Sequence, residues 1–472
     1  MTVHITELDM IASNYKNNSV IRFDHPTQMQ RIKLQWKVIL IYAVACMVIF
    51  GFITRMKSYY AVPTKSEDLC LSLHVSNETL TPLTGTRHLL VSAYLERRLE
   101  ENMVRIISVF KRDSVRDLFC VFCCMDNMST TLPAQVLMHS DHFGFPFVTT
   151  DILCKIPANC RIVPYVTLMP HANVNSTLKQ TFLPIKNLQS GQKKEEDYHY
   201  QFNFTVCISN LFENYNNVLQ FTQSLEMYRL LGVGRVVVYN TSCGPELDML
   251  LKSYSQEGFV EVLPWPIELY LTPSPGWNPD QGGELHYYGQ LATLNDCVYR
   301  YMYLSHYVLL NDIDEIIVPY QHTSLNSAFD MLQRQYPQAG VFMIQNHIFP
   351  NTQFDLSGRY HVPYWEGVPG VNILEHIYRE EPNWKQTSKK SHPFKMVVQP
   401  RVVEQTSVHS VLHSFKDVVE VPPGVCRIIH VRVALQKALT KNELHQDTRL
   451  WDYHRQLVPN VDKALRRAGL LE

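Results

Sequence analysis

The spacing of hydrophobic and polar residues changes along this chain. Between residues 70 and 169, short apolar runs rich in Val, Ile, Phe and Tyr alternate with polar turns. This pattern predicts a small β-rich domain over residues 70–190. From residue 198, strand-like runs alternate with helical stripes, which is typical of a parallel sheet covered by helices on both faces. We therefore expect an α/β domain over residues 198–435 and a charged helical extension over residues 436–472.

The elements of the α/β domain follow from the same spacing. Runs of apolar and β-branched residues predict strands, whereas apolar positions three or four residues apart predict helices. Strands are expected at residues 202–208, 235–239, 259–265, 307–310, 341–347, 394–403 and 427–433, and helices at 217–231, 245–254, 291–304 and 441–468.

One uncharged apolar run precedes the β-rich domain. Residues 38–53 contain no charged side chain, and basic residues are more numerous before the run than after it. This asymmetry predicts a transmembrane helix with its N-terminal side in the cytoplasm. The expected arrangement is a cytoplasmic tail at 1–37, a signal anchor at 38–54 and a stem at 55–69. The alternative is a buried helix of a soluble domain.

Two further features favour a lumenal location for the rest of the chain. Five N-x-S/T sequons and ten of the eleven cysteines follow the apolar run, as in glycosylated, disulfide-bonded proteins of the secretory pathway. Cys120 and Cys123 form a C-x-x-C motif without a second ligand pair, so disulfides are favoured over zinc, with their pairing left open. We expect a type II membrane protein of the Golgi. The candidate glycosylation sites are Asn77, Asn127, Asn175, Asn203 and Asn240.

The net charge and the glycine motifs of the chain exclude some classes of ligand. Lys and Arg number 43 and Asp and Glu number 44, a net charge of -1, so no global field attracts nucleic acid. No G-x-G-x-x-G follows the first strand of the α/β domain, and no G-x-x-x-x-G-K-[ST] exists in the chain. These absences argue against a Rossmann dinucleotide site and against a P-loop.

The candidate chemistry centres on Tyr307–Pro319, where two apolar runs flank Asn311-Asp312-Ile313-Asp314-Glu315. If the strand continues through this motif, Asp312 and Asp314 point to the same side. Two carboxylates at the carboxyl end of a strand suit Mg²⁺ or Mn²⁺ bound to the phosphates of a substrate. The alternative is an ordinary polar turn.

Several short segments that follow one another in a fixed order along the chain are more specific than this motif alone. The chain resembles glycosyltransferase family 92, formerly the domain of unknown function DUF23. The resemblance covers roughly residues 91–432. It lies in residues 204–208, 232–239, 263–265, 289–300 and 312–319, and more loosely in 400–409 and 427–432.

The resemblance implies a fold and a set of ligands. It implies a GT-A-type nucleotide-sugar-binding domain in which Asp312 and Asp314 bind Mn²⁺ (or Mg²⁺) and the donor diphosphate. His409 or His430 would supply a third metal ligand. A lone histidine is more often structural, so both alternatives stay open for each.

Further roles are assigned by position in the sequence. Glu315 is a candidate catalytic residue that is expected to orient the metal ligands or to bind sugar hydroxyls, with a salt bridge in the turn as the alternative. Glu366, beside aromatic residues that could stack on a sugar, is the first candidate for the catalytic base. Its competitors are Glu375, Glu380 and Glu381. Candidates for nucleotide-sugar binding that could equally cap a helix or form core ion pairs are Asn295, Asp296 and Arg300.

Together these inferences predict an enzyme. We expect a hexosyltransferase that moves galactose from UDP-galactose onto a terminal sugar of a glycoprotein or glycolipid glycan, with a metal ion and with inversion. The resemblance implies β-1,4-galactosyltransferase activity toward terminal galactose. The alternative is a lectin-like membrane protein on the same scaffold. A hydrolase is disfavoured because Asp312 and Asp314 are too close to flank one glycosidic bond.

Overall fold

The computed structural model describes residues 44–49, 73–124, 131–170, 180–188, 199–381, 394–435 and 439–472. Residues 66–472 form one compact unit that is distinct from residues 1–65. Most of the predicted signal anchor lies outside the described residues, as do the sequons at Asn127 and Asn175. Within the described part of the chain, no helix has the length and apolar character needed to cross a membrane.

The β-rich domain consists of two antiparallel sheets. Two disulfides confirm the prediction of structural cystines: Cys120–Cys154 joins the two sheets, and Cys124–Cys160 lies beside it. One sheet has the order β1 (Thr81–Pro82), β2 (Leu89–Glu96), β3 (Met103–Lys111), β7 (Phe147–Lys155) and β6 (Gln135–Met138), and the other β5 (Leu132–Pro133), β4 (Phe119–Cys123), β8 (Tyr165–Met169) and β9 (Leu183–Pro184).

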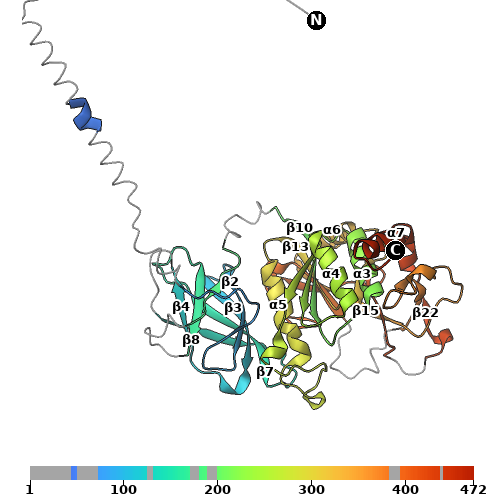
Figure 1. The fold of residues 1–472 in the computed structure, drawn as a ribbon, viewed down its shortest axis with the longest axis horizontal. Coiled ribbons are helices and arrows are strands. Elements are labelled where there is room, and N and C mark those ends of the chain that lie inside the picture. The colour runs from blue at the N-terminus through green and yellow to red at the C-terminus, as the bar shows by residue number, and fades with distance from the viewer. Residues whose placement is uncertain are drawn as a thin grey trace, which may run out of the picture. The chain divides into compact units, whose positions relative to one another are not determined.

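The α/β domain is built on a mixed sheet (Figure 1). Its first four strands are parallel, as predicted, but the remaining strands are partly antiparallel. The order is β12 (Val260–Pro264), β11 (Arg235–Asn240), β10 (Phe202–Leu211), β13 (Ser305–Asn311), β17 (Phe394–Val398), β15 (Ala339–Pro350), β21 (Cys426–Arg432) and β14 (Glu315–Pro319), with β20 (Asp417–Glu420) beside β15.

Helices cover both faces of this sheet. Alternate residues of β10 and β13 enter two cores: Val206 and Leu309 pack with one set of helices, and Cys207 and Leu310 with another. The first face is covered by α3 (Val218–Leu231), α4 (Pro245–Gln256), α6 (Leu325–Gln335) and α7 (His454–Arg467), and the second by α5 (Gln290–Arg300).

Helix α5 also packs against the β-rich domain. Leu89 and Val109 from the β-rich domain belong to the same core as Leu294 and Val298 of α5. Figure 1 shows α5 between the β-rich domain and the mixed sheet. The predicted domains at 70–190 and 198–435 therefore share one interior. The smaller pairs are β16 (Tyr378–Arg379) with β22 (His445–Gln446) and β18 (Val403–Thr406) with β19 (Val411–Ser414).

The C-terminal segment is part of the α/β core and not a separate extension. Leu457 and Val461 of α7 are fully buried together with Leu225 of α3. The sequence of this segment is rich in charged residues because the other face of α7 is exposed to solvent. The prediction of a helix near the C-terminus is confirmed, but the expected boundary at residues 435–436 does not separate two structural units.

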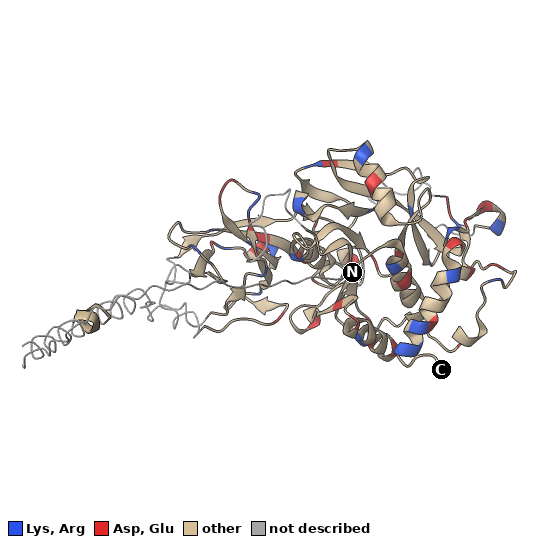
Figure 2. Ribbon diagram, turned by 90° about the horizontal axis from the view of Figure 1, so that it is seen from above, with Lys and Arg blue, Asp and Glu red and all other residues tan. Residues whose placement is uncertain are grey.

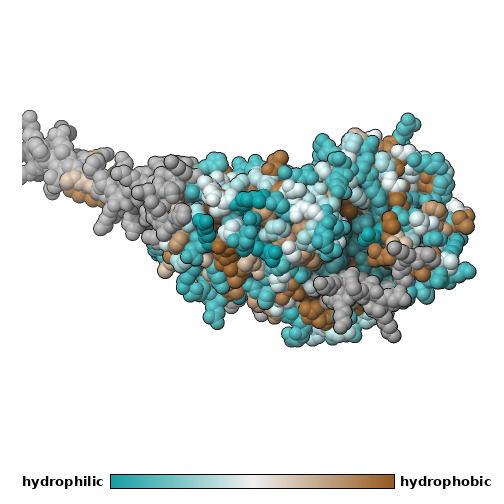
Figure 3. All heavy atoms as spheres, turned by 90° about the horizontal axis from the view of Figure 1, so that it is seen from below, coloured by the Kyte–Doolittle hydropathy of each residue, from teal (hydrophilic) through white to brown (hydrophobic). Residues whose placement is uncertain are grey.

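The surface carries charges of both signs. Figure 2 shows basic and acidic residues interspersed over the ribbon, in agreement with the net charge of -1. The face drawn in Figure 3 is mostly hydrophilic, with several separate hydrophobic patches.

Candidate active site

The candidate site lies where β10 and β13 end. These strands are parallel neighbours, with Ile208 opposite Asn311, so their carboxyl ends meet at one edge of the sheet, where ligands bind in such folds. Strand β13 stops at Asn311, and Asp312 to Asp314 form a turn into β14. Strand alternation therefore does not apply to the two aspartates.

The turn brings both aspartates to one pocket of about 350 Å³. It is closed locally because the backbone N–H of Asp312 donates to Glu315 Oε2 at 3.0 Å. The lining residues are Ser209, Asn210, Leu211, Phe212, Glu213, Tyr215, Tyr287, Asp312, Ile313, Asp314, His430, Arg432 and Val433.

Asp312 is held by two side chains of the protein. Gln290 Nε2 donates to its Oδ1 at 2.8 Å, and Lys395 Nζ donates to its Oδ2 at 2.8 Å. Lys395 is buried, and burial alone would lower the pKa of its ammonium group. The carboxylates of Asp312 and Glu315 outweigh burial and raise that pKa, so Lys395 stays charged beside Asp312.

Asp314 forms a pair with His430. Asp314 Oδ2 lies 3.0 Å from His430 Nε2, but this nitrogen has no hydrogen-bond partner in suitable geometry among the described residues. Burial would raise the pKa of Asp314, yet His430 and Arg432 hold it below its usual value. In turn, burial would lower the pKa of His430, but Asp314 and Glu315 raise it. Each group thus favours the charged form of the other.

This pair fits a divalent cation. A carboxylate and an imidazole are ligand types that bind Mg²⁺ or Mn²⁺, so Asp314 and His430, 3.0 Å apart at the pocket, are the residues that would hold such an ion. No group of three or more His, Cys, Asp or Glu residues suited to a metal ion exists in the part of the chain that the structure describes. A cation with two protein ligands takes its other ligands from substrate phosphates and water, as Mg²⁺ commonly does.

Glu315 supports the pair from behind and does not line the pocket. It is buried, and Asn346 Nδ2 donates to its Oε1 at 2.9 Å. Oε1 also lies 3.4 Å from His430 Nδ1, which is the position of a group that orients a histidine ligand. Burial raises the pKa of Glu315 to about 7. Its Oε2 also lies 3.7 Å from Lys395 Nζ. The geometry therefore agrees with the salt-bridge alternative and with orientation of His430, whereas Glu315 does not line the pocket where a sugar would bind.

Two residues at the pocket were missed by sequence reasoning. Arg432 lines the pocket and forms no ion pair with any described residue; its position two residues after His430 was the available signal. Tyr215 also lines the pocket, and its buried hydroxyl has no hydrogen-bond partner among the described residues. No periodicity in the sequence distinguishes this tyrosine from others.

A strained turn forms one wall of the pocket. Tyr287 and Tyr288 have φ values of 41° and 55°, in the left-handed region that non-glycine residues rarely adopt. Asn210 Nδ2 donates to both of their carbonyl oxygens, at 3.1 and 3.0 Å, and Trp265 Nε1 donates to Tyr288 O at 2.8 Å. These hydrogen bonds offset the strain and fix Tyr287 beside the two aspartates.

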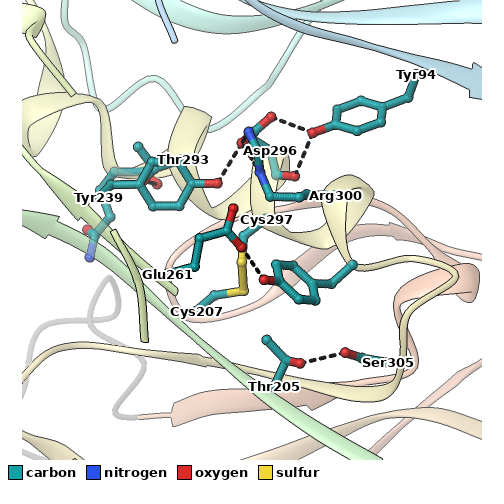
Figure 4. The surroundings of a disulfide bond; sticks show 12 residues. Tyr94, Thr205, Cys207, Tyr239, Glu261, Thr293, Asp296, Cys297, Arg300 and Ser305 are labelled. Carbon is teal, nitrogen blue, oxygen red and sulfur yellow. Dashed lines mark hydrogen bonds and ion pairs between the residues drawn. A yellow bond between two sulfur atoms is a disulfide. The ribbon is translucent and has the colours of Figure 1, made fainter. Parts of the chain in front are cut away.

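Asp296 and Arg300 are not part of this pocket. They pair with each other at 2.8 Å on α5, and the hydroxyls of Tyr94 and Tyr239 donate to Asp296 at 2.7 and 2.6 Å (Figure 4). These partners keep Asp296 charged in the interior. Asp296 and Arg300 therefore form the core ion pair that the sequence left as the alternative, and neither lines the pocket where they were predicted to bind the nucleotide sugar.

Asn295 has the same kind of role. Its side chain is buried and exchanges hydrogen bonds with the backbone of Thr406, at 2.8 Å from Nδ2 to O and at 3.0 Å from the backbone N–H to Oδ1. This exchange fastens α5 to β18. Asn295 does not line the pocket, so its predicted contact with the nucleotide is not observed.

Glu366 lies apart from the pocket. Its side chain is 69% exposed and pairs with His361 Nε2 at 3.2 Å. The adjacent Trp365 is tied to α7 because its indole Nε1 donates to Asp462 at 2.7 Å. Glu366 does not line the pocket of Asp312 and Asp314, so its role as the base stays a prediction that this pocket does not support.

The two histidines that are candidates for the third metal ligand differ in their position relative to the pocket. His409 Nδ1 lies 2.8 Å from the carbonyl oxygen of Phe394, and its ring stacks on Trp277. It does not line the pocket, whereas His430 does. Of the two candidates for the third metal ligand, the geometry favours His430.

Comparison with known proteins adds an independent line of evidence. The family model of Glycosyltransferase family 92 matches residues 202–461. Glycosyltransferase family 92 protein F13G3.3 of Caenorhabditis elegans is 27% identical over 243 residues, which cover 50% of this chain and 44% of that protein. Beta-1,4-galactosyltransferase galt-1 of the same organism is 23% identical over 203 residues, covering 42% and 44%. Each match thus spans less than half of the relative's length.

A solved structure was also found. The crystal structure of S. aureus TarS 1-349 in complex with UDP-GlcNAc is 11% identical and covers 56% of this chain and 72% of that one, with a TM-score of 0.26. The family match extends over more than half of the chain and includes every residue that lines the pocket. The chain belongs to glycosyltransferase family 92.

Proposed function

We propose that this protein is a glycosyltransferase that moves a hexose from a UDP-sugar onto a terminal sugar of a glycan. The observation that carries the proposal is the convergence of Asp314, His430 and Arg432 on one pocket at the carboxyl edge of the sheet. In this proposal the α/β domain is a GT-A-type nucleotide-sugar-binding domain, and membership of family 92 supports the reaction class.

The donor would be bound by complementary charges. The Arg432 guanidinium, which has no ionic partner among the described residues, is suited to the donor phosphates. Asp314 and His430 would hold Mn²⁺ or Mg²⁺, which when bound neutralises charge on the departing UDP. Lys395 and Gln290 keep Asp312 in place at the pocket wall. The hydroxyl of Tyr215 is available to a polar group of the donor.

We propose that the transferred sugar is galactose, that it forms a β-1,4 linkage and that the configuration at its anomeric carbon is inverted. The name of one relative, Beta-1,4-galactosyltransferase galt-1, supports this choice. The acceptor class is a glycoprotein or glycolipid glycan that ends in galactose.

We further propose a Golgi location with type II topology. The uncharged run at residues 38–53 and the five sequons support it. Disulfides at Cys120–Cys154 and Cys207–Cys297 agree with an oxidising compartment.

The direct test is incubation of the purified full chain with UDP-galactose and other UDP-sugars, a panel of glycans and either Mn²⁺ or EDTA. We expect transfer from UDP-galactose to a galactose-terminated acceptor, and loss of turnover with EDTA. Nuclear magnetic resonance of the product reports the linkage and the anomeric configuration. Glycan binding without turnover from any UDP-sugar would favour a lectin-like protein and overturn the proposal.

A further inference from the structure

A tryptophan lies exposed beside the candidate pocket. Trp277 is 38% exposed and belongs to the long connection between β12 and α5. The base of this loop is closed by backbone hydrogen bonds from Ser274 N to Leu285 O at 2.9 Å and from Glu284 N to Thr272 O at 2.7 Å. An indole on a loop of this kind is held in position before any ligand arrives.

The tip of the loop is equally well fixed. Gln281 Oε1 accepts hydrogen bonds from the backbone N–H groups of Trp277 and Asn278, at 2.8 and 3.3 Å. Gly276 packs so closely on Gln281 that a Cβ there would lie 2.0 Å from Oε1. Because the backbone is ordered in advance, a ligand that stacks on Trp277 loses little affinity to loop ordering.

Aromatic rings from distant parts of the chain surround Trp277. His409 stacks parallel to it, with ring centroids 5.4 Å apart and an interplanar angle of 14°. The ring of Phe143 in the β-rich domain lies nearly perpendicular to the indole, with ring centroids 5.4 Å apart, and the ring centroid of His286 lies 4.8 Å away. Phe143 and His286 stack on each other at 4.0 Å. These three residues position the indole.

The aromatic group is continuous with the candidate pocket. The ring centroids of Trp277 and Tyr287 are 6.0 Å apart, and Tyr287 lines the pocket together with Asp312 and Asp314. One aromatic ring therefore separates the exposed indole from the place where the donor would react.

We propose that Trp277 is the binding platform for the acceptor glycan, on which the apolar face of a galactose-type ring stacks. The assignment rests on the proposed transferase function for the reaction that follows. Sugars present an apolar face of C–H groups, and an indole offers a large flat surface that suits it. Phe143 makes the β-rich domain a positioning part of this acceptor site.

The test compares the full chain with Trp277→Ala and Trp277→Phe, using lactose as a galactose-terminated probe. Lactose binding without donor is measured by saturation-transfer nuclear magnetic resonance. The KM for lactose in the transfer reaction and the Kd of UDP with Mn²⁺ are measured in parallel. Leu269→Ala is the matched control because Leu269 lies in the same connection and is 78% exposed.

We expect Trp277→Ala to weaken lactose binding and to raise its KM about 10-fold or more, while the Kd of UDP and the melting temperature stay unchanged. Trp277→Phe keeps most of the affinity because a ring remains, and Leu269→Ala behaves as the original chain. Unchanged lactose affinity in Trp277→Ala, or a parallel loss of UDP affinity, would overturn the proposal. Lactose binding that depends on Trp277 in a chain without transfer would support the platform and contradict the transferase.

Discussion

At the scale of single residues, two aspartates that look equivalent in sequence have different surroundings. Asp312 has its carboxylate oxygens occupied by Gln290 and Lys395. Asp314 faces His430, whose Nε2 atom has no hydrogen-bond partner among the described residues. The carboxylate of Asp314 faces an imidazole that could share a cation with it, whereas both oxygens of Asp312 accept hydrogen bonds from protein donors.

The first prediction concerns this residue. Asp314→Asn removes the charge that balances His430 and would share a cation with it, so we expect transfer to fall at least about 100-fold. The chain should remain folded because Asp314 is at a partly exposed turn. Initial rates with UDP-galactose and thermal unfolding check this. Asp330→Asn, an exposed change on α6, is the control, and full turnover of Asp314→Asn would refute the assignment.

At the scale of elements, α5 connects the site to the rest of the molecule. Gln290 at its first turn donates to Asp312, and its other end carries the Asp296–Arg300 pair. The Cys207–Cys297 disulfide ties the helix to β10, so the strand and the helix on which the pocket is built are covalently linked (Figure 4).

A second prediction follows for the disulfide. Cys207 and Cys297 are 90 residues apart, and a cross-link over such a loop stabilises a fold by about 4.6 kcal/mol in the chain-entropy estimate. The double variant Cys207→Ala/Cys297→Ala should lose stability of this order and UDP affinity with it. Chemical denaturation measures the loss. Cys243→Ala is the control because Cys243 is unpaired; equal stability of the two variants would contradict the expectation.

The predicted elements were mostly right where they are local. Strand β11 at Arg235–Asn240 and helix α3 at Val218–Leu231 match the expected positions within two residues, because a buried run and an apolar stripe are both properties of neighbouring residues. The antiparallel neighbour of β13 could not be predicted in this way. This pairing joins β13 to β17, which lies some 90 residues later in the chain.

At the scale of the whole molecule, buried ion pairs link the β-rich domain to the α/β domain. Arg105 is fully buried and pairs with Glu96 at 3.2 Å, with Asp151 at 2.6 Å and with Glu404 of β18 at 2.6 Å. Gln405 Nε2 also donates to Asp151 at 2.9 Å. Charges in such a position are costly to leave unpaired, so the two domains are expected to unfold together.

The third prediction is a pH dependence. Burial alone would raise the pKa of Asp151, but His139 and Arg105 outweigh it and hold the pKa at about 2. A lowered carboxylate pKa stabilises the fold above the unfolded pKa near 3.9, and this contribution is lost as the pH falls through about 2. The contribution is about 2 kcal/mol.

The check is urea unfolding of the original chain and Asp151→Asn between pH 2 and pH 6. The variant should be less stable at pH 6, and the difference in the free energy of unfolding should shrink steadily below pH 4. A difference that is constant over this range would contradict the sign and the assignment. Asp113→Asn, at an exposed position in the same domain, serves as the control.

The fourth prediction tests the lumenal location. Asn77 and Asn203 are exposed in the structure, so both sequons are accessible to N-glycosylation if the chain enters the secretory pathway. Enzymatic removal of N-glycans should lower the apparent mass of the full chain made in secretory cells. Asn77→Gln should lower the mass of the untreated chain by one glycan. No shift with either treatment would contradict type II topology.

The sequence by itself determined the local strands and helices, the position of the acidic motif at Asp312–Asp314 and the family, because these depend on residues close together in the chain. Only the tertiary structure decided that His430 joins Asp314, that Asp296 is a core ion pair and that Glu366 faces solvent. Those outcomes depend on which long-range neighbours supply charge and hydrogen bonds, and a buried carboxylate and a ligand carboxylate look alike until their partners are in place.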